Sequence, residues 1–228
     1  MELSALRTHY LLNVNPAQVT LANDRDDQWV PSWVLPALLE TCFVVVRRGT
    51  MMSSRIPVGI RGEERSQRWA AWCPANAIQQ IITPADLLRR FETTKDSLAS
   101  PAPRGLRSLA VEWRWLTHSW GPGGSAGFEL ATGKRTMTSR SDLDIVVYAS
   151  EPLSRSDARR LLVTTTALDH EMAVDIRVET PVCGFALAEY ARSSGKSILL
   201  RTLAGPILGD NPWNGDLSRC RCKNHAEA

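Results

Sequence analysis

Asp142 and Asp144 stand one residue apart in the segment SDLDIVVYA, where a run of apolar and β-branched residues begins. The run predicts a buried strand, and side chains two positions apart on a strand project to the same side. Two carboxylates held this close repel each other, and a divalent cation between them turns repulsion into coordination. Because Mg²⁺ prefers one or two carboxylates together with phosphate oxygens and waters, the pair predicts a site for Mg²⁺ and a polyphosphate.

A third carboxylate follows one predicted helix later. Asp175 lies inside VDIRV, another short strand-like run. If this strand pairs beside the first, Asp175 completes a group of three. Three carboxylates can hold two metal ions roughly 3.5–4 Å apart for in-line phosphoryl or nucleotidyl transfer. A purely structural role stays open for each aspartate, as a loop residue or a solvent-facing strand residue.

A glycine-rich turn, GGSAG, precedes the aspartates and leads into a predicted helix. Backbone N–H groups at a helix N-terminus and a neighbouring hydroxyl form a site for an anion, so we expect Gly124 and Ser125 to bind the phosphates of a leaving pyrophosphate. Arg140, in the basic loop before the aspartates, could neutralise charge on that leaving group. The alternative is a plain turn followed by a loop cation.

Three arginines recur along RGEERSQR, a stretch that we expect to enter a helix continuing through the following Trp and Ala residues. On that helix Arg61, Arg65 and Arg68 would share one face. Their guanidinium groups could bind phosphate in a bidentate manner, or the face could dock an acidic partner protein. A merely solvated basic face is the alternative.

The chain alternates predicted strands and helices, which indicates an α/β (α+β) fold with a mixed β-sheet core and a smaller N-terminal α/β domain. We predict an N-terminal domain over 1–92 and a linker rich in Ser, Thr, Pro and Ala over 93–106. The main domain follows over 107–213, and a flexible tail over 214–228.

Three local patterns complete the prediction of the elements. TPADLLRRFE begins a helix with Thr83 as its N-cap. LAVEWRWLTHSW is expected to form a strand, and the residues from Gly205 onward a loosely packed series of turns.

Composition excludes several classes of protein. The chain has 228 residues, a formal net charge of +3 and 43% hydrophobic residues. This slight basic excess is too weak for a nucleic-acid binder. No apolar run approaches the roughly 20 residues of a membrane span, and no signal-peptide pattern is visible in the first residues, so we expect a soluble, cytoplasmic protein.

Cysteine and histidine give no sign of a further metal site. The five cysteines are an odd, scattered set, and Cys220 and Cys222 are too close together for usual zinc spacing. His118 and His170 lack a second ligand at metal-binding spacing, so we expect structural roles for both.

Taken together, these segments resemble the phosphoribosyl-dephospho-CoA transferases, also called malonate decarboxylase holo-acyl-carrier-protein synthases. The resemblance runs from about residue 8 to 213. SDLD by itself would indicate only the DNA polymerase β-like nucleotidyltransferase superfamily, whereas IPVGIRG…RSQR and TPVCGFALAEYARS…LLRT narrow it to this family. The sheet core is then expected to be of the nucleotidyltransferase type.

The resemblance implies the reaction and the roles. The donor would be 2′-(5″-triphosphoribosyl)-3′-dephospho-CoA and the acceptor a serine of the apo acyl-carrier subunit of malonate decarboxylase, with pyrophosphate leaving. Asp142 and Asp144 would bind Mg²⁺ and be catalytic, with Asp175 as the third carboxylate. Gly124 and Ser125 would hold the triphosphate, and the N-terminal domain would help to bind the dephospho-CoA moiety or the carrier.

The sequence departs from the family at two points. Gly123 replaces a usually apolar or aromatic residue, and Phe128-Glu129 replaces a Trp-Gln pair. Glu129 would put a negative charge near the polyphosphate unless it faces away. Two other functions stay open: a Mg²⁺-dependent nucleotidyltransferase that adenylylates a protein or small molecule, and a non-catalytic partner-binding protein. The oligomeric state, the catalytic base and the number of metal ions also stay open.

Overall fold

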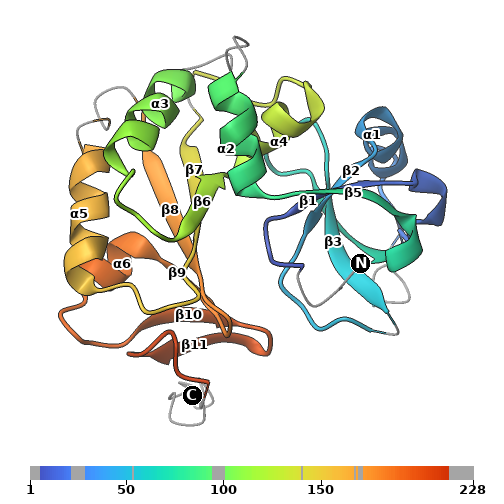
Figure 1. The fold of residues 1–228 in the computed structure, drawn as a ribbon. Helices are drawn as coiled ribbons and strands as arrows, with labels where there is room; N and C mark the ends of the chain where they lie inside the picture. The colour runs from blue at the N-terminus through green and yellow to red at the C-terminus, as the bar shows by residue number, and fades with distance from the viewer. Residues whose placement is uncertain are drawn as a thin grey trace, which may run out of the picture. The chain divides into compact units, whose positions relative to one another are not determined.

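The computed structural model describes residues 6–21, 29–52, 54–93, 101–139, 141–166, 168 and 172–215. The fold is mixed, with two β-sheets and helices packed on them, which confirms the predicted α/β (α+β) class (Figure 1). The chain forms two compact units. The first comprises Met1–Ala99 and Gly121–Thr138, and the second comprises Ser100–Trp120 and Ser139–Ala228.

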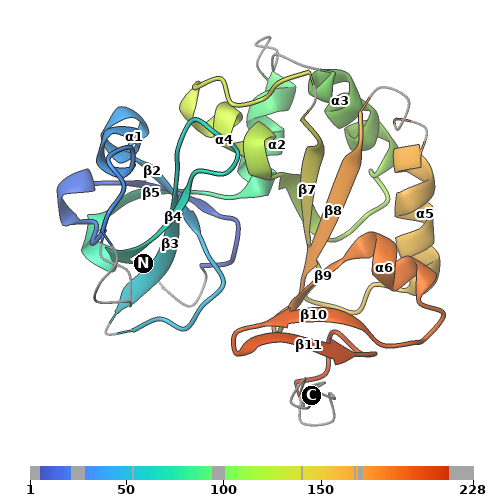
Figure 2. The same cartoon turned by 180° about the vertical axis from the view of Figure 1, so that it is seen from behind.

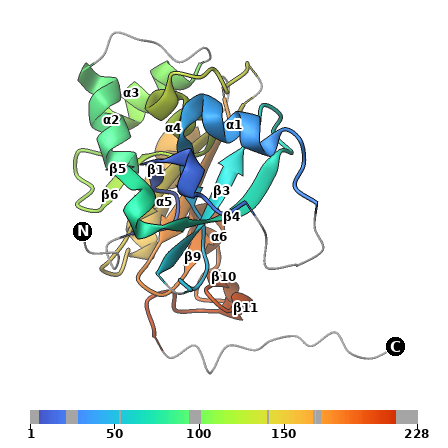
Figure 3. The same cartoon turned by 90° about the vertical axis from the view of Figure 1, so that its right-hand side faces the viewer.

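The first unit is built on an antiparallel sheet of five strands in the order β4-β3-β2-β1-β5. Its strands are β1 (Leu11–Val14), β2 (Phe43–Val46), β3 (Arg55–Arg61), β4 (Arg68–Pro74) and β5 (Ile78–Ile82). Short 3-10 turns lie at Pro16–Gln18 and Ala75–Ala77. One face of the sheet carries the larger core, which includes Leu12, Val44, Val58 and Ile60. Helix α1 (Val34–Thr41) covers this face and adds Val34 and Leu38 (Figure 3).

The opposite face of this sheet packs against α2 (Pro84–Thr93) and α4 (Gly124–Thr132). Leu87 from α2 and Phe128 from α4 join Leu11 and Ile82 in a second apolar cluster. Because α4 is held in this cluster, segment 121–138 belongs to the first unit. The compact units therefore differ from the predicted continuous domain over 107–213.

A six-stranded sheet in the order β11-β10-β9-β8-β7-β6 belongs to the second unit, except for the last two residues of β6. The strands are β6 (Ser119–Pro122), β7 (Leu143–Tyr148), β8 (Val174–Glu179), β9 (Gly184–Ala186), β10 (Ile198–Thr202) and β11 (Gly205–Gly209). β7 and β8 are parallel, and the pairs from β8 to β11 are antiparallel. Helices α3 (Ala102–Glu112), α5 (Arg155–Thr166) and α6 (Leu187–Arg192) flank β7 and β8, and α3 lies beside α5 in both views (Figures 1 and 2).

Two helix starts follow the sequence signals. At α2, the Thr83 N–H donates to Asp86 Oδ2 at 2.9 Å, and the Asp86 N–H donates back to Thr83 Oγ1 at 3.1 Å. At α5, the Asp157 N–H donates to Ser154 Oγ at 3.0 Å. The α2 cap is reciprocal, whereas at α5 the Ser154 hydroxyl accepts from the Asp157 N–H and donates to the Asp157 carboxylate at 2.7 Å. Both caps satisfy a backbone N–H group that has no partner inside the helix.

Three predicted elements are wrong. The helix expected through RSQRWAAW is strand β4, where buried residues alternate with partly or fully exposed ones and this pattern overrides the helix propensity of alanine. The strand expected at LAVEWRWLTHSW is largely α3 and the turn after it, because Ala102, Leu106, Leu109 and Trp113 are buried at helical spacing. Gly205–Gly209 form β11 rather than loose turns, whereas residues 210–215 are turns and irregular structure as expected.

The start of α3 also takes up the end of the predicted linker 93–106. Prolines 101 and 103 suggested a linker, but proline is accepted in the first turn of a helix. Residues 94–100, Arg140, His170, Cys220, Cys222 and most of the predicted tail lie outside the described residues. Among the helices within the described residues, none is both long and apolar enough to span a bilayer.

Candidate functional site

A cavity of about 490 Å³ lies in the first unit, between α4 and the face of the sheet that packs on it. Four neighbouring strands contribute to its wall in pairs of alternate residues: His9 and Leu11, Val45 and Arg47, Gly59 and Arg61, Arg68 and Ala70. Residues two apart on a strand share a face, so this wall is one face of the sheet. Gly59 pairs with both Val45 and Ala70. Because glycine has no side chain and its two neighbours are not bulky, space for the cavity remains above this part of the sheet.

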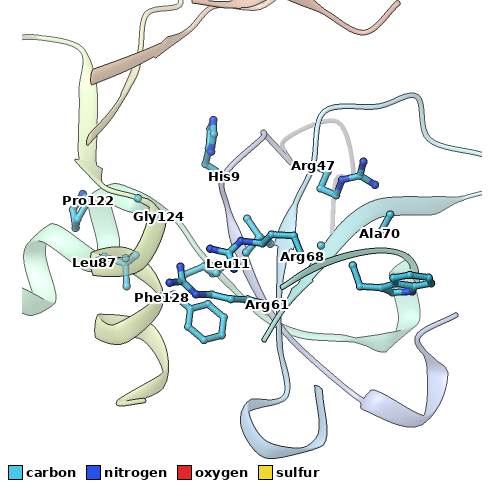
Figure 4. Close-up of a pocket in the computed structure, with 15 residues that line it drawn as sticks. His9, Leu11, Arg47, Arg61, Arg68, Ala70, Leu87, Pro122, Gly124 and Phe128 are labelled. Atoms are coloured by element: carbon cyan, nitrogen blue, oxygen red, sulfur yellow. The ribbon is translucent and has the colours of Figure 1, made fainter. Parts of the chain in front are cut away.

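Arg61 joins the sheet to the glycine-rich turn. Its side chain is buried, and its Nη2 donates a hydrogen bond of 2.6 Å to Ser125 Oγ on α4. Its guanidinium also lies 5.6 Å from the centre of the Phe128 ring, within the range of a cation–π contact (Figure 4). The structure thus brings together Arg61 and Ser125, which are 64 positions apart in sequence.

Arg68 faces the same cavity because β3 and β4 form a hairpin in which Arg61 and Arg68 are paired positions. Paired residues of an antiparallel ladder share a face. The shared helical face predicted for Arg61, Arg65 and Arg68 is therefore wrong. Arg65 is exposed in the loop that connects the two strands and does not line the cavity.

The first turn of α4 closes one end of the cavity. Gly123 and Gly124 line it, and Gly124 has a φ of 52°, in the left-handed region that favours glycine. Gly121 approaches α2 so closely that a Cβ there would lie 1.9 Å from the Pro84 carbonyl oxygen. The N–H groups of a helix N-terminus attract anions, so the turn has the geometry predicted for Gly124 and Ser125.

Glu129 faces away from the cavity. Its carboxylate accepts hydrogen bonds from the backbone N–H groups of Thr136 and Met137, at 2.8 and 2.9 Å, and its side chain is buried. The departure from the family at this position therefore puts no negative charge into the cavity, which no aspartate or glutamate of the described residues lines.

Sequence reasoning missed two polar residues of the cavity, His9 and Arg47. Arg47 directly follows β2, and its side chain passes over Gly59, where a Cβ would lie 3.3 Å from Arg47 Cδ. The available signal was its alternation with Val45, two positions earlier on the same face. His9 adopts a positive φ of 75° before β1, and its position in the wall depends on strand pairing that a single sequence does not display.

The predicted carboxylates lie in the second unit. Asp144 and Asp175 are directly paired positions in the parallel β7–β8 ladder, so they share a face at the start of both strands. Asp142 precedes β7 by one residue, and all three carboxylates are partly exposed. The expectation that Asp175 pairs beside the first strand is confirmed.

Asp175 has a cationic neighbour on its own strand. Arg177 Nη2 donates to Asp175 Oδ2 at 2.8 Å, with side-chain exposures of 32% for Arg177 and 42% for Asp175. An ion pair this exposed contributes little stability, so a competing cation could displace the arginine at small cost.

The carboxylates suit a metal ion that shares its ligands with phosphate and water better than one enclosed by protein ligands alone. Within the described ranges, no three or more His, Cys, Asp or Glu side chains are grouped as a metal site. Two carboxylates on one face still match Mg²⁺, which takes its remaining ligands from phosphate and water. A protein-only cage of three carboxylates does not form in this arrangement, so Asp175 as a metal ligand stays a prediction, and Arg140 lies outside the described residues.

Comparison with protein families and curated proteins gives a consistent result. Residues 7–84 match the family model described as phosphoribosyl-dephospho-CoA transferase MdcG N-terminal domain, and residues 68–212 match the C-terminal domain of the same name. The phosphoribosyl-dephospho-CoA transferase of Pseudomonas aeruginosa is 37% identical over 183 residues, covering 80% of this chain and 85% of the relative. Proteins with the same name from Klebsiella pneumoniae strain 342 and Azotobacter vinelandii are 36% and 34% identical, over 80% and 85% of this chain and 86% and 90% of the relatives. No solved structure matches.

Proposed function

The chain belongs to the phosphoribosyl-dephospho-CoA transferase family, and from this we propose that it transfers phosphoribosyl-dephospho-CoA to a carrier protein. The proposed donor is 2′-(5″-triphosphoribosyl)-3′-dephospho-CoA, and the proposed acceptor is a serine of the apo acyl-carrier subunit of malonate decarboxylase. The observation that carries the proposal is the match of both family domains along the chain, from residue 7 to residue 212. We expect the reaction to take place in the cytoplasm.

In the proposed reaction the serine oxygen attacks the α-phosphorus of the donor. The bond from the α-phosphorus to the bridging oxygen of the β-phosphate breaks, and pyrophosphate leaves with that oxygen. The serine proton passes to a carboxylate or to water, and a phosphodiester joins the prosthetic group to the carrier. Most of the catalytic effect in such transfers comes from positioning and from compensation of negative charge.

We propose that Asp142 and Asp144 hold Mg²⁺, with Asp175 beside Asp144 as a further ligand when Arg177 is displaced. Mg²⁺ would supply charge compensation at the reacting phosphate. The parallel pairing of Asp144 with Asp175 supports this role, because it keeps two carboxylates on one face at neighbouring strand ends.

The proposed site for the triphosphate is the α4 end of the cavity. Gly124 and Ser125 would offer hydrogen bonds from the helix N-terminus, and Arg61 and Arg68 would add positive charge from the sheet. Arginine has only donors, so Ser125 Oγ must accept from Arg61, which directs the hydroxyl proton of Ser125 toward another acceptor. A phosphate oxygen satisfies that requirement.

The test is intact-mass spectrometry of the purified apo acyl-carrier subunit. It is incubated with Mg²⁺, this protein and the triphosphoribosyl donor, with ATP replacing the donor in a parallel reaction. We expect a mass gain equal to phosphoribosyl-dephospho-CoA. Asp142→Ala and Asp144→Ala should abolish it, whereas Asp210→Ala, an exposed aspartate after β11, should not.

Two results would contradict the proposal. A gain equal to AMP, seen only with ATP, would assign an adenylylating activity. No gain in either reaction, with folded enzyme and a carrier that an authentic relative can modify, would leave a binding protein.

A further inference from the structure

The cavity of the first unit has two separate cationic ends. Arg61 and Arg68 extend toward α4, where Ser125 and the glycine-rich turn lie, whereas Arg47 lies on the other side, over the strands (Figure 4). The side chain of Arg47 crosses Gly59. Arg47 is therefore not part of the cluster around Ser125.

The wall between these ends is neutral. It is formed by Leu11, Val45, Gly59 and Ala70, which lie in one row across four strands. In the part of the chain that the structure describes, no aspartate or glutamate lines the cavity, and no carboxylate pairs with Arg47. The two ends thus offer hydrogen-bond donors and positive charge across an uncharged floor.

This pattern fits a ligand with two anionic groups separated by a neutral part. We propose that Arg47 binds a second phosphate group of the donor, distinct from the triphosphate bound at the α4 end. The inference rests on the proposed function, because the proposed donor has this chemistry: a triphosphate on one ribose, and a diphosphate between adenosine and pantetheine. Arg47 then binds the diphosphate.

Arg47 becomes a specificity-determining residue by this assignment. ATP and the triphosphoribosyl donor present the same triphosphate, and the α4 end cannot distinguish them. Only the donor carries a second phosphate group in addition. Contact with Arg47 therefore favours the donor over ATP, because a charge-assisted hydrogen bond is strong and a ligand without the diphosphate does not form it.

The test is a crossed binding experiment on the full-length protein by isothermal titration calorimetry. One probe is dephospho-CoA, which has the diphosphate arm but no triphosphate, and the other is inorganic tripolyphosphate. Arg47→Gln should weaken dephospho-CoA binding about tenfold and leave tripolyphosphate binding within about twofold, as expected for loss of one charge-assisted hydrogen bond. Arg68→Gln should show the opposite preference.

Arg55→Gln is the matched control. Arg55 begins strand β3, is exposed and does not line the cavity, so its replacement removes one positive charge from the same sheet without touching the site. It should leave the affinity for both probes unchanged. Thermal melting of each variant checks that the fold is retained.

The proposal would be overturned if Arg47→Gln weakened both probes equally, since the residue would then act only through long-range charge. It would also be overturned if Arg47→Gln affected neither probe. The binding results are independent of turnover, so the two proposals can fail separately. A crossed pattern without transfer to the carrier would contradict the proposed function alone, and transfer without a crossed pattern would contradict the role of Arg47 alone.

Discussion

The hydrogen bond from Arg61 to Ser125 should give a large coupling energy, because one partner is a buried charge. The Nη2–Oγ distance is 2.6 Å, and the residue Arg61 is only 8% exposed. Replacing Ser125 with alanine removes an acceptor from a guanidinium that has little access to water. Loss of a hydrogen bond to a charged group costs about 1.5–3 kcal/mol, so Ser125→Ala should lower the free energy of unfolding by that amount.

Ser125→Ala should hardly change the free energy of unfolding once the Arg61 guanidinium has been removed. In an Arg61→Met background the arginine stem is largely retained against Phe128, but no donor faces Ser125. Alanine is a slightly better helix former than serine, by up to about 0.5 kcal/mol. Ser125→Ala in this background should therefore be neutral or weakly stabilising, and the coupling energy of the cycle should be about 1.5–3 kcal/mol.

The assay is urea unfolding of the wild-type protein, the two single variants and the double variant, followed by circular dichroism. The slope against urea must agree across all four proteins, so that changes in midpoint report on stability. Independent sites add within about 0.5 kcal/mol. If Ser125→Ala costs the same in both backgrounds within that margin, the 2.6 Å contact is not an energetically coupled pair and the reasoning fails.

Four further predictions concern single residues. Burial raises the pKa of Asp86, but hydrogen bonds from Thr83 and the charge of Arg89 outweigh it and hold the pKa below its usual value. The stability from Asp86 is therefore present above the usual carboxyl pKa of about 3.9 and lost as the pH falls through the lower, folded value. The stability gap between wild type and Asp86→Asn should narrow on acidification, and a gap that widens would contradict this sign. Burial raises the pKa of Cys73 to about 11, so iodoacetamide at pH 8 should label this thiol only after unfolding. Rapid labelling of Cys73 in the native protein, detected by peptide mapping, would refute this prediction. Arg65→Gln should keep wild-type affinity for tripolyphosphate by calorimetry, because Arg65 is exposed in the hairpin loop; a tenfold loss would place it in the site. Gly121→Ala should destabilise the protein by about 3 kcal/mol in urea, since its Cβ would meet the α2 backbone, and a change below about 0.5 kcal/mol would show that the contact relaxes.

Local signals predicted the elements whose ends carry side-chain caps or whose apolar runs are long. The Thr83 cap of α2, the Ser154 cap of α5 and the strand after Asp142 all fall where the sequence indicates. The errors occurred where composition was given more weight than periodicity. RWAAW contains good helix formers, but its buried positions alternate with less buried ones. The segment from Ala102 to Trp113 contains a proline, but its buried positions repeat at helical spacing.

Arg61 and Arg68 were predicted to lie together as phosphate ligands, but for the wrong reason, because the prediction assumed a helix. A separation of seven residues brings two side chains to one face of a helix after two turns. The same separation brings them opposite each other in a hairpin, where they are paired positions of β3 and β4. The helix and the hairpin differ in where they place Arg65, which lies between the two arginines in sequence. A helix keeps Arg65 on the shared face, whereas a hairpin moves it out into the loop.

Arg47 could be found only by combining strand phase with strand pairing. Along β2, Val44 and Val46 belong to the larger core, so the alternate positions Val45 and Arg47 must face the other side of the sheet. A slip of one residue in the pairing of β2 with β3 would exchange these two sets and carry an arginine into the core. The burial of the valines forbids that slip. The position of Arg47 is therefore fixed by the register of β2 and β3, which the replacement of its side chain does not change. Replacing Arg47 should accordingly change binding and leave the fold intact.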